Sequence, residues 1–148
     1  MIERMNFFMA MIPPTATHQQ QKIRVVERSG RHVPLVYDGA EVAAARSKLT
    51  AHLAAFRPSE PLTGPVSLLV KWCFPLDEGG RHRNGEWRTT RPDTDNVQKL
   101  LKDCMTGLGF WRDDAQVCSE VAQKFWADVP GIYIEVGEIR QMPERGSQ

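Results

Sequence analysis

Hydrophobic residues recur along this 148-residue chain at spacings that predict helices in two places. In "AEVAAARSKLTAHLAAF", residues 40–56, apolar side chains return every three or four positions, as in an amphipathic helix of about four turns. "NVQKLLKDCMTGL", residues 96–108, has the same spacing, and Gly109 follows it as a natural C-terminal cap. The pattern therefore predicts two main helices.

Other apolar runs are short and rich in β-branched or aromatic residues, which is typical of strands. The predicted strands are residues 6–12, 66–74, 117–129 and 131–139. "KIRVVERSGRHVPLVYD", residues 22–38, alternates basic and apolar side chains on both sides of Ser29-Gly30 and predicts an irregular hairpin. These elements predict an α+β fold, a small mixed sheet of about four strands with two main helices packed on it. We expect a single domain over residues 1–148, with disordered ends at 1–5 and 141–148.

Composition narrows the class of protein. With 41% hydrophobic and 25% charged residues, the chain is neither disordered nor fibrous. No apolar run approaches the roughly 20 residues of a membrane span, and "MIERMNFFMAMIPP" is a poor signal peptide, so we expect a cytoplasmic protein with no membrane partner. Three cysteines without a C-x-x-C pair argue against disulfides or a cysteine zinc site and predict small buried side chains.

The charge is unevenly distributed, although the net charge is only +1. "RHRNGEWRTTR" holds Arg81, Arg83, Arg88 and Arg91 directly before a group of aspartates. A basic loop beside carboxylates suits a polyanionic substrate, so these arginines are predicted to bind nucleic acid. A solvated loop is the alternative interpretation, and for Trp87 we favour packing over stacking on a base.

The aspartates suggest a metal site. If "RPDTD" is extended, Asp93 and Asp95 point the same way, and Asp113 or Asp114 after the second helix is a natural third ligand. Mg²⁺ takes one or two carboxylates together with waters and substrate phosphate. Lys99 lies one turn beyond Asp95 and can offer its charge to the reacting phosphate. The spacing thus predicts a metal site for a phosphate-type substrate.

Each acidic residue also has an ordinary structural interpretation. Thr94 or Asp95 would serve as a helix cap, and Asp93 as a turn residue after proline. Asp113 and Asp114 would be turn residues before a strand. Asp103 lies four residues after Lys99, where an exposed ion pair is worth only a few tenths of a kcal/mol.

At residues 91–117 the chain resembles a known family. "RPDTDNVQKLLKDCMTGLGFWRDDAQV" is similar to the signature of the RusA-type Holliday-junction resolvases: D-x-D-N-x-x-K, a helix, a glycine-aromatic step and D-D-x-Q-V. The resemblance implies a homodimeric, Mg²⁺-dependent endodeoxyribonuclease that acts in DNA recombination and repair. Such an enzyme resolves four-way DNA junctions by paired symmetric nicks and leaves 5′-phosphate and 3′-hydroxyl ends.

The resemblance also implies roles for particular residues. Asp93, Asp95 and Asp114 match the metal-binding carboxylates, Lys99 matches the catalytic lysine, and Lys124 matches a further basic position that we assign to nucleic-acid binding. Mn²⁺ would substitute for Mg²⁺. The segment around "SGRHVPLVYD" departs from the family as an additional hairpin. Two alternatives stay open: a related nuclease for other branched or single-stranded DNA, and a non-catalytic protein that binds DNA junctions.

Overall fold

The computed structural model describes residues 4–16, 22–37 and 39–141. The elements in chain order are β1 (Arg4–Met9), β2 (Lys22–Arg28), β3 (Arg31–Tyr37), α1 (Ala40–Ala54), β4 (Val66–Pro75), α2 (Thr94–Gly107), the 3₁₀ turn η2 (Asp114–Gln116), β5 (Val117–Ala127) and β6 (Gly131–Glu138). The predicted α+β class and four-stranded mixed sheet are confirmed. Arg4 and Met5 belong to β1 rather than to a disordered end, whereas the same expectation for residues 1–3 and 142–148 falls outside the described residues.

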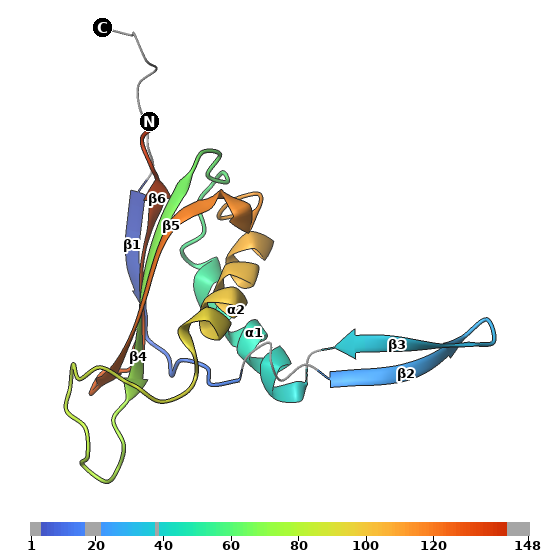
Figure 1. The fold of residues 1–148 in the computed structure, drawn as a ribbon. Coiled ribbons are helices and arrows are strands. Elements are labelled where there is room, and N and C mark those ends of the chain that lie inside the picture. Colours follow the sequence, from blue (N-terminus) through green and yellow to red (C-terminus); the bar gives the residue numbers. More distant parts are fainter. Residues whose placement is uncertain (1–3, 17–21, 38, 142–148) are drawn as a thin grey trace, which may run out of the picture.

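The main sheet has the strand order β1-β6-β4-β5 (Figure 1). β4 pairs with β5 in parallel and with β6 antiparallel, and β1 pairs antiparallel with β6 of the same chain. Neighbouring parallel strands need a crossover connection, which here contains a long loop, α2 and η2. β5 therefore forms one edge of the sheet, with α2 in the connection that leads to it.

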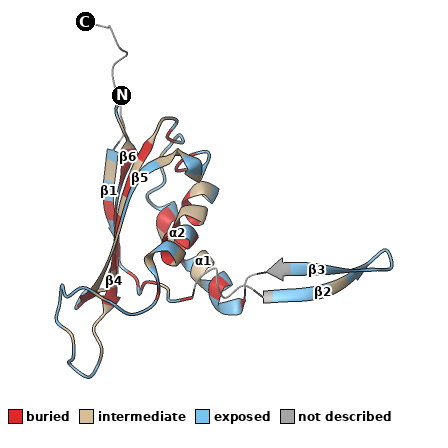
Figure 2. Ribbon diagram, viewed as in Figure 1, coloured by how far each residue is buried: buried red, intermediate tan, exposed pale blue. Residues whose placement is uncertain are grey.

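The core lies between the sheet and the helices, where Figure 2 shows buried residues on the facing sides. Alternate side chains of β4 are buried, from Val66 to Phe74, and they face α1 and α2. The predicted stripe of the second helix is confirmed over five positions: Val97, Leu100, Leu101, Cys104 and Met105. Phe110 and Trp111 anchor the end of this helix in the core. Gly109 between helix and anchor has φ +79°, which suits glycine.

A chain of polar contacts crosses the interface between the sheet and α2. The buried indole of Trp72 donates to Oε1 of Gln98 at 2.6 Å, and Nε2 of Gln98 donates to Glu120 at 2.7 Å. Lys102 completes the chain through an ammonium–carboxylate contact of 3.0 Å with Glu120. Gln98 is only 4% exposed, so its amide fixes how α2 lies on β4 and β5.

Two expectations about side chains need correction. Cys104 is buried as predicted, but Cys73 is only half-buried, and Cys118 is exposed on β5, the edge strand. Phe56, predicted within the first helical stripe, lies beyond the end of α1 and stacks on Phe7 with ring centroids 4.4 Å apart.

The predicted hairpin is confirmed. β2 and β3 form a separate antiparallel two-stranded sheet that projects from the body of the molecule (Figure 1). Its turn at Ser29 and Gly30 has φ values of +53° and +76°, the left-handed region that tight hairpin turns require.

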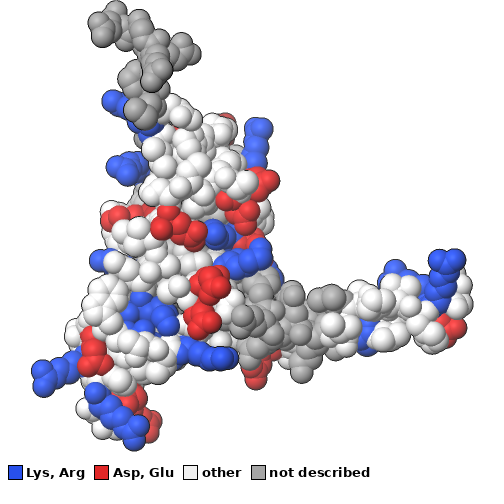
Figure 3. Space-filling model, in the orientation of Figure 1, with Lys and Arg blue, Asp and Glu red and all other residues white. Residues whose placement is uncertain are grey.

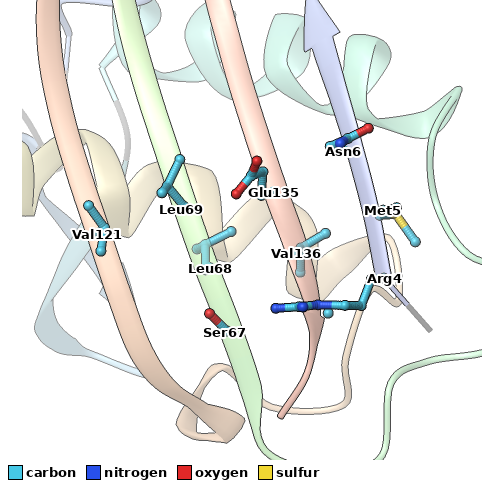
Figure 4. A pocket seen from close by; sticks show the side chains of 10 residues that line it. Arg4, Met5, Asn6, Ser67, Leu68, Leu69, Val121, Glu135 and Val136 are labelled. Carbon is cyan, nitrogen blue, oxygen red and sulfur yellow. The ribbon is translucent and has the colours of Figure 1, made fainter. Parts of the chain in front are cut away.

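The opposite face of the main sheet carries no helix, and a depression of about 390 Å³ lies there between β1, β4, β5 and β6 (Figure 4). Its lining includes Asn6, Ser67, Leu69 and Glu135, and none of the predicted site residues. Within the described ranges, no helix combines the length and apolar character that a membrane span requires.

Candidate metal and DNA-binding site

Asp93 and Asp95 flank the first residue of α2, which begins at Thr94 rather than near Asn96. Asp93 is the N-cap residue in an extended conformation, yet its side chain makes no capping hydrogen bond. The proposed caps, Thr94 and Asp95, lie instead inside the first turn. A helix N-terminus favours negative charge, so two exposed carboxylates are tolerated there even close together.

Lys99 follows one turn after Asp95, and its ammonium lies 3.6 Å from Asp103. This contact is the exposed ion pair that the spacing allowed. The Lys99 side chain is 61% exposed, so it has room to turn toward another anion.

Asp113 and Asp114 have different surroundings. The Asp113 carboxylate accepts from the backbone N–H of Ala115 at 2.9 Å, and Gln116 accepts in return from the Asp113 N–H at 3.1 Å. Asp113 is thus held in a capping box, which confirms its structural interpretation and leaves Asp114 as the better candidate ligand. Asp114 is half-buried at the first position of η2.

The structure does not bring Asp114 to Asp93 and Asp95 within one copy of the chain. Nearly all of the 14-residue helix α2 lies between the pair and Asp114, and at 1.5 Å per residue the whole helix is about 21 Å long. Figure 1 shows η2 and the start of β5 at the end of α2 opposite its N-terminus. Accordingly, no three His, Cys, Asp or Glu side chains among the described residues lie close enough to share a metal ion. The described residues of one copy therefore do not bring the three aspartates together, and their shared role in metal binding stays a prediction.

Arg88 and Lys124 are both half-buried and make contacts within the chain, while their predicted role in binding nucleic acid stays a prediction. The Arg88 guanidinium lies 4.3 Å from the ring centroid of Phe74 and 4.5 Å from that of Trp126, and it donates to the Arg91 carbonyl at 2.6 Å. Burial lowers the pKa of Arg88. These contacts hold the loop against the sheet.

Lys124 holds the last part of that loop. Its ammonium donates to the carbonyls of Thr90 and Pro92, both at 2.7 Å, directly before Asp93. Burial lowers the pKa of Lys124, and the charge of nearby Arg88 lowers it further, whereas the Asp93 carboxylate opposes the shift. Lys124 therefore fixes the backbone from which Asp93 projects.

Backbone hydrogen bonds also attach this loop to the outer edge of β5. Gly85 N–H donates to the Trp126 carbonyl at 2.7 Å, Trp126 N–H to Glu86 at 2.8 Å, and Arg88 N–H to Lys124 at 3.0 Å. Trp87 packs on Phe125, with ring centroids 4.4 Å apart, as expected. Even so, 60% of the residue remains exposed to solvent. No sequence pattern indicated that Phe74 and Trp126 both contact the Arg88 guanidinium.

The exposed groups that remain are compatible with a cation and a polyanion. Asp93 and Asp95 offer hard oxygen atoms that no hydrogen bond to another described residue occupies, which fits Mg²⁺. Arg81, Arg83 and Arg91 are exposed on the loop that ends at this pair. Figure 3 shows basic and acidic side chains close together on this face of the molecule.

Comparisons with known proteins agree with these features. The family model "Endodeoxyribonuclease RusA" matches residues 12–137. Over 91 residues the chain is 34% identical to the crossover junction endodeoxyribonuclease rusA of Lactococcus phage r1t, covering 62% of this chain and 70% of the phage protein. It is 33% identical over 92 residues to the uncharacterized protein YqaN of Bacillus subtilis (strain 168), covering 56% of this chain and 64% of YqaN. With most of its length matched, the chain belongs to the RusA endodeoxyribonuclease family.

Proposed function

We propose that this chain is an Mg²⁺-dependent endonuclease that nicks branched DNA, with four-way junctions as its preferred substrate. One observation carries the proposal: two exposed carboxylates, Asp93 and Asp95, without a hydrogen bond to another described residue, lie at the start of α2 on a loop end that Lys124 anchors. Family membership and the printed name of the phage relative support the choice of substrate. The products would be 5′-phosphate and 3′-hydroxyl ends.

The residues at this position would divide the work as follows. Asp93 and Asp95 would hold Mg²⁺ or Mn²⁺, which supplies an activated water and polarises the scissile phosphate. Lys99 would exchange its exposed contact with Asp103 for the charge that builds up on the phosphate. Arg81, Arg83 and Arg91 would neutralise neighbouring phosphates, because they are exposed on the adjoining loop.

Asp114 would reach this site from a second copy. Since about 18 Å of helix, from Asp95 to Gly107, lies between Asp95 and Asp114 in one chain, the third carboxylate needs a partner arranged head to tail. A two-fold axis gives that arrangement twice, so a homodimer would contain two equivalent sites. Two sites at a fixed separation suit paired cuts in opposed strands.

The outer edge of β5 is the contact that would produce this dimer. The backbone groups of Lys124 and Trp126 point outward and are paired with the loop. Because alternate residues of a strand direct their backbone groups to the same side, those of Glu120 also point outward, before the register shift at Cys118. Antiparallel pairing of this stretch of β5, centred on Glu120, with the same stretch of a second copy would bring the start of one β5 beside the far half of the other. Asp114 of one copy would then approach Asp93 of its partner.

Carboxylate replacement tests the metal site. Asp95→Asn should abolish nicking of a four-way junction in Mg²⁺ and retain junction binding, since it removes one negative charge beside phosphate. Asp113→Asn is the matched control, because asparagine can still cap Ala115, and it should cut like the parent. Undiminished cutting by Asp95→Asn would overturn the metal site.

Subunit mixing tests the shared site. Asp95→Asn and Asp114→Asn should each be inactive alone, whereas their mixed dimer has one site with both changes and one intact site. Mixing should therefore restore nicking of one strand. If each site came from a single chain, every site would carry one change and the mixture would stay inactive.

The choice of substrate separates the remaining alternatives. Equal cutting rates on a four-way junction and on a linear duplex of matched sequence would favour a nuclease for other DNA. Junction binding without any cutting, over a range of Mg²⁺ and Mn²⁺ concentrations, would favour a non-catalytic junction-binding protein.

A further inference from the structure

The β2–β3 hairpin is an arm that has no pairing partner in the main sheet. Among the described residues, its two strands pair with each other, over seven residue pairs from Lys22–Tyr37 to Arg28–Arg31. Seven residues at about 3.3 Å each give an arm roughly 23 Å long. Figure 1 shows it extending well beyond the helices.

An isolated two-stranded hairpin is only marginally stable in water. This arm also leaves apolar side chains in solvent, with Ile23 70% and Val25 62% exposed. In addition, Arg28 and Arg31 lie directly opposite each other beside the turn. Like charges in that position destabilise a hairpin. An arm built this way gains stability when something neutralises its tip.

The charge of the arm indicates which kind of partner would neutralise its tip. Residues 22–37 contain four Lys and Arg side chains and one glutamate, a balance of +3, in a chain of net charge +1. Figure 3 shows the basic side chains gathered toward the free end of the arm. The other residues therefore sum to only −2 over a much larger surface. A DNA duplex, with one negative charge per about 1.7 Å, is a better electrostatic match than a second copy of this chain.

We propose that the β2–β3 hairpin binds the phosphate backbone of a duplex arm of the DNA substrate, with Arg28 and Arg31 as its main contacts. A two-stranded ribbon fits the major groove, which is about 12 Å wide, so the basic tip can reach the phosphates of both groove walls. The arm lies apart from the Asp93–Asp95 pair and would hold DNA away from the cut. This inference rests on the proposed function only in taking DNA as the substrate.

The test removes the two charges at the tip. R28Q/R31Q is compared with R57Q/R140Q, which lowers the net charge equally at exposed positions outside the arm. Binding to a linear duplex and to a four-way junction is measured without divalent metal across a range of salt concentrations. Each phosphate contact contributes about −0.9 to the slope of log K against log salt. R28Q/R31Q should therefore flatten the slope by about 1.8 and weaken binding about 60-fold at 0.1 M salt, whereas the control variant should bind within about threefold of the parent.

Two further measurements separate the possible failures. Thermal unfolding of R28Q/R31Q should occur no lower than for the parent, because the change relieves like-charge repulsion. At limiting junction concentration its cutting rate should fall together with its affinity, whereas Asp95→Asn loses cutting but retains binding. If R28Q/R31Q binds DNA with the affinity and salt slope of the parent, the proposed DNA-binding role of the arm is wrong, and the proposed nuclease function is unaffected. A change in the sedimentation of R28Q/R31Q without DNA would also overturn it, by assigning the arm to a second copy.

Discussion

The contact between Trp72 and Gln98 makes a quantitative prediction about how α2 is held. Gln98→Leu keeps the approximate volume of the side chain but removes the acceptor for a fully buried indole N–H. An unsatisfied buried donor costs about 1–3 kcal/mol. Gln98→Leu also removes the hydrogen bond from Gln98 to the Glu120 carboxylate. This loss costs less free energy than the loss of a fully buried hydrogen bond to a charged group, because the carboxylate is partly exposed and water can replace the Gln98 donor.

The expected loss of unfolding free energy for Gln98→Leu is therefore about 2–4 kcal/mol, or roughly 5–15 °C in Tm for a domain of this size. Urea unfolding followed by far-UV circular dichroism measures it. When Gln98→Leu is already present, Trp72→Phe leaves no buried polar group without a hydrogen-bond partner, because both the indole N–H and the Gln98 amide are absent. The two changes should together cost about 1–3 kcal/mol less than the sum of the single changes.

Two outcomes would refute this reasoning. If the free energies of the single variants add within about 0.5 kcal/mol, the two side chains are not coupled. If Gln98→Leu is as stable as the parent, the hydrogen bond does not hold the helix. The cavity that Trp72→Phe creates occurs with and without Gln98, so it cancels in the comparison.

Three further predictions concern single positions. The backbone N–H groups of Thr63 and Gly64 lower the pKa of Glu138, so its contribution to stability is present above its ordinary pKa of 4.5 and disappears as pH falls through the lowered value. Glu138→Gln should accordingly reduce the drop in the urea midpoint between pH 7 and pH 3, and an unchanged drop would contradict this. The Lys124→Met variant should cut a saturating junction at least tenfold more slowly than the parent, with the same salt dependence of DNA binding. A slope of log K against log salt that is flatter by about 0.9 would instead show that Lys124 contacts a DNA phosphate. Gly131→Ala should destabilise by about 1–3 kcal/mol in urea, because its Cβ would lie 2.6 Å from the Met9 carbonyl, and Gly107→Ala, which meets open space, should not.

Much of the fold was predictable because burial leaves a periodic signal. The apolar stripe of α2 and the alternating buried positions of β4 follow from packing one helix face and one sheet face into the same core. Exposure of Cys118 was not predictable, because a sequence does not say which strand ends at an edge. The helix start was misplaced because aspartate is favourable both as N-cap and in the first turn, so Asp93 and Asp95 looked equivalent.

The candidate site was predictable in its chemistry and less so in its arrangement. Asp93, Asp95 and Asp114 stood out by residue type, yet the predicted helix between them already required a wide separation. Arg88 and Lys124 show a different limit. A basic side chain that binds a carbonyl and one that binds a phosphate read alike in sequence, and only the tertiary structure shows that these two hold a loop.

The length of α2 has a consequence for when such an enzyme is active. If its carboxylates complete a site only across two copies, a lone chain is harmless to DNA at any metal concentration. Below the dissociation constant of the dimer, the number of working sites rises with the square of the protein concentration. A modest change in synthesis would then switch cutting on or off sharply, and cuts would arise in pairs because the sites themselves do.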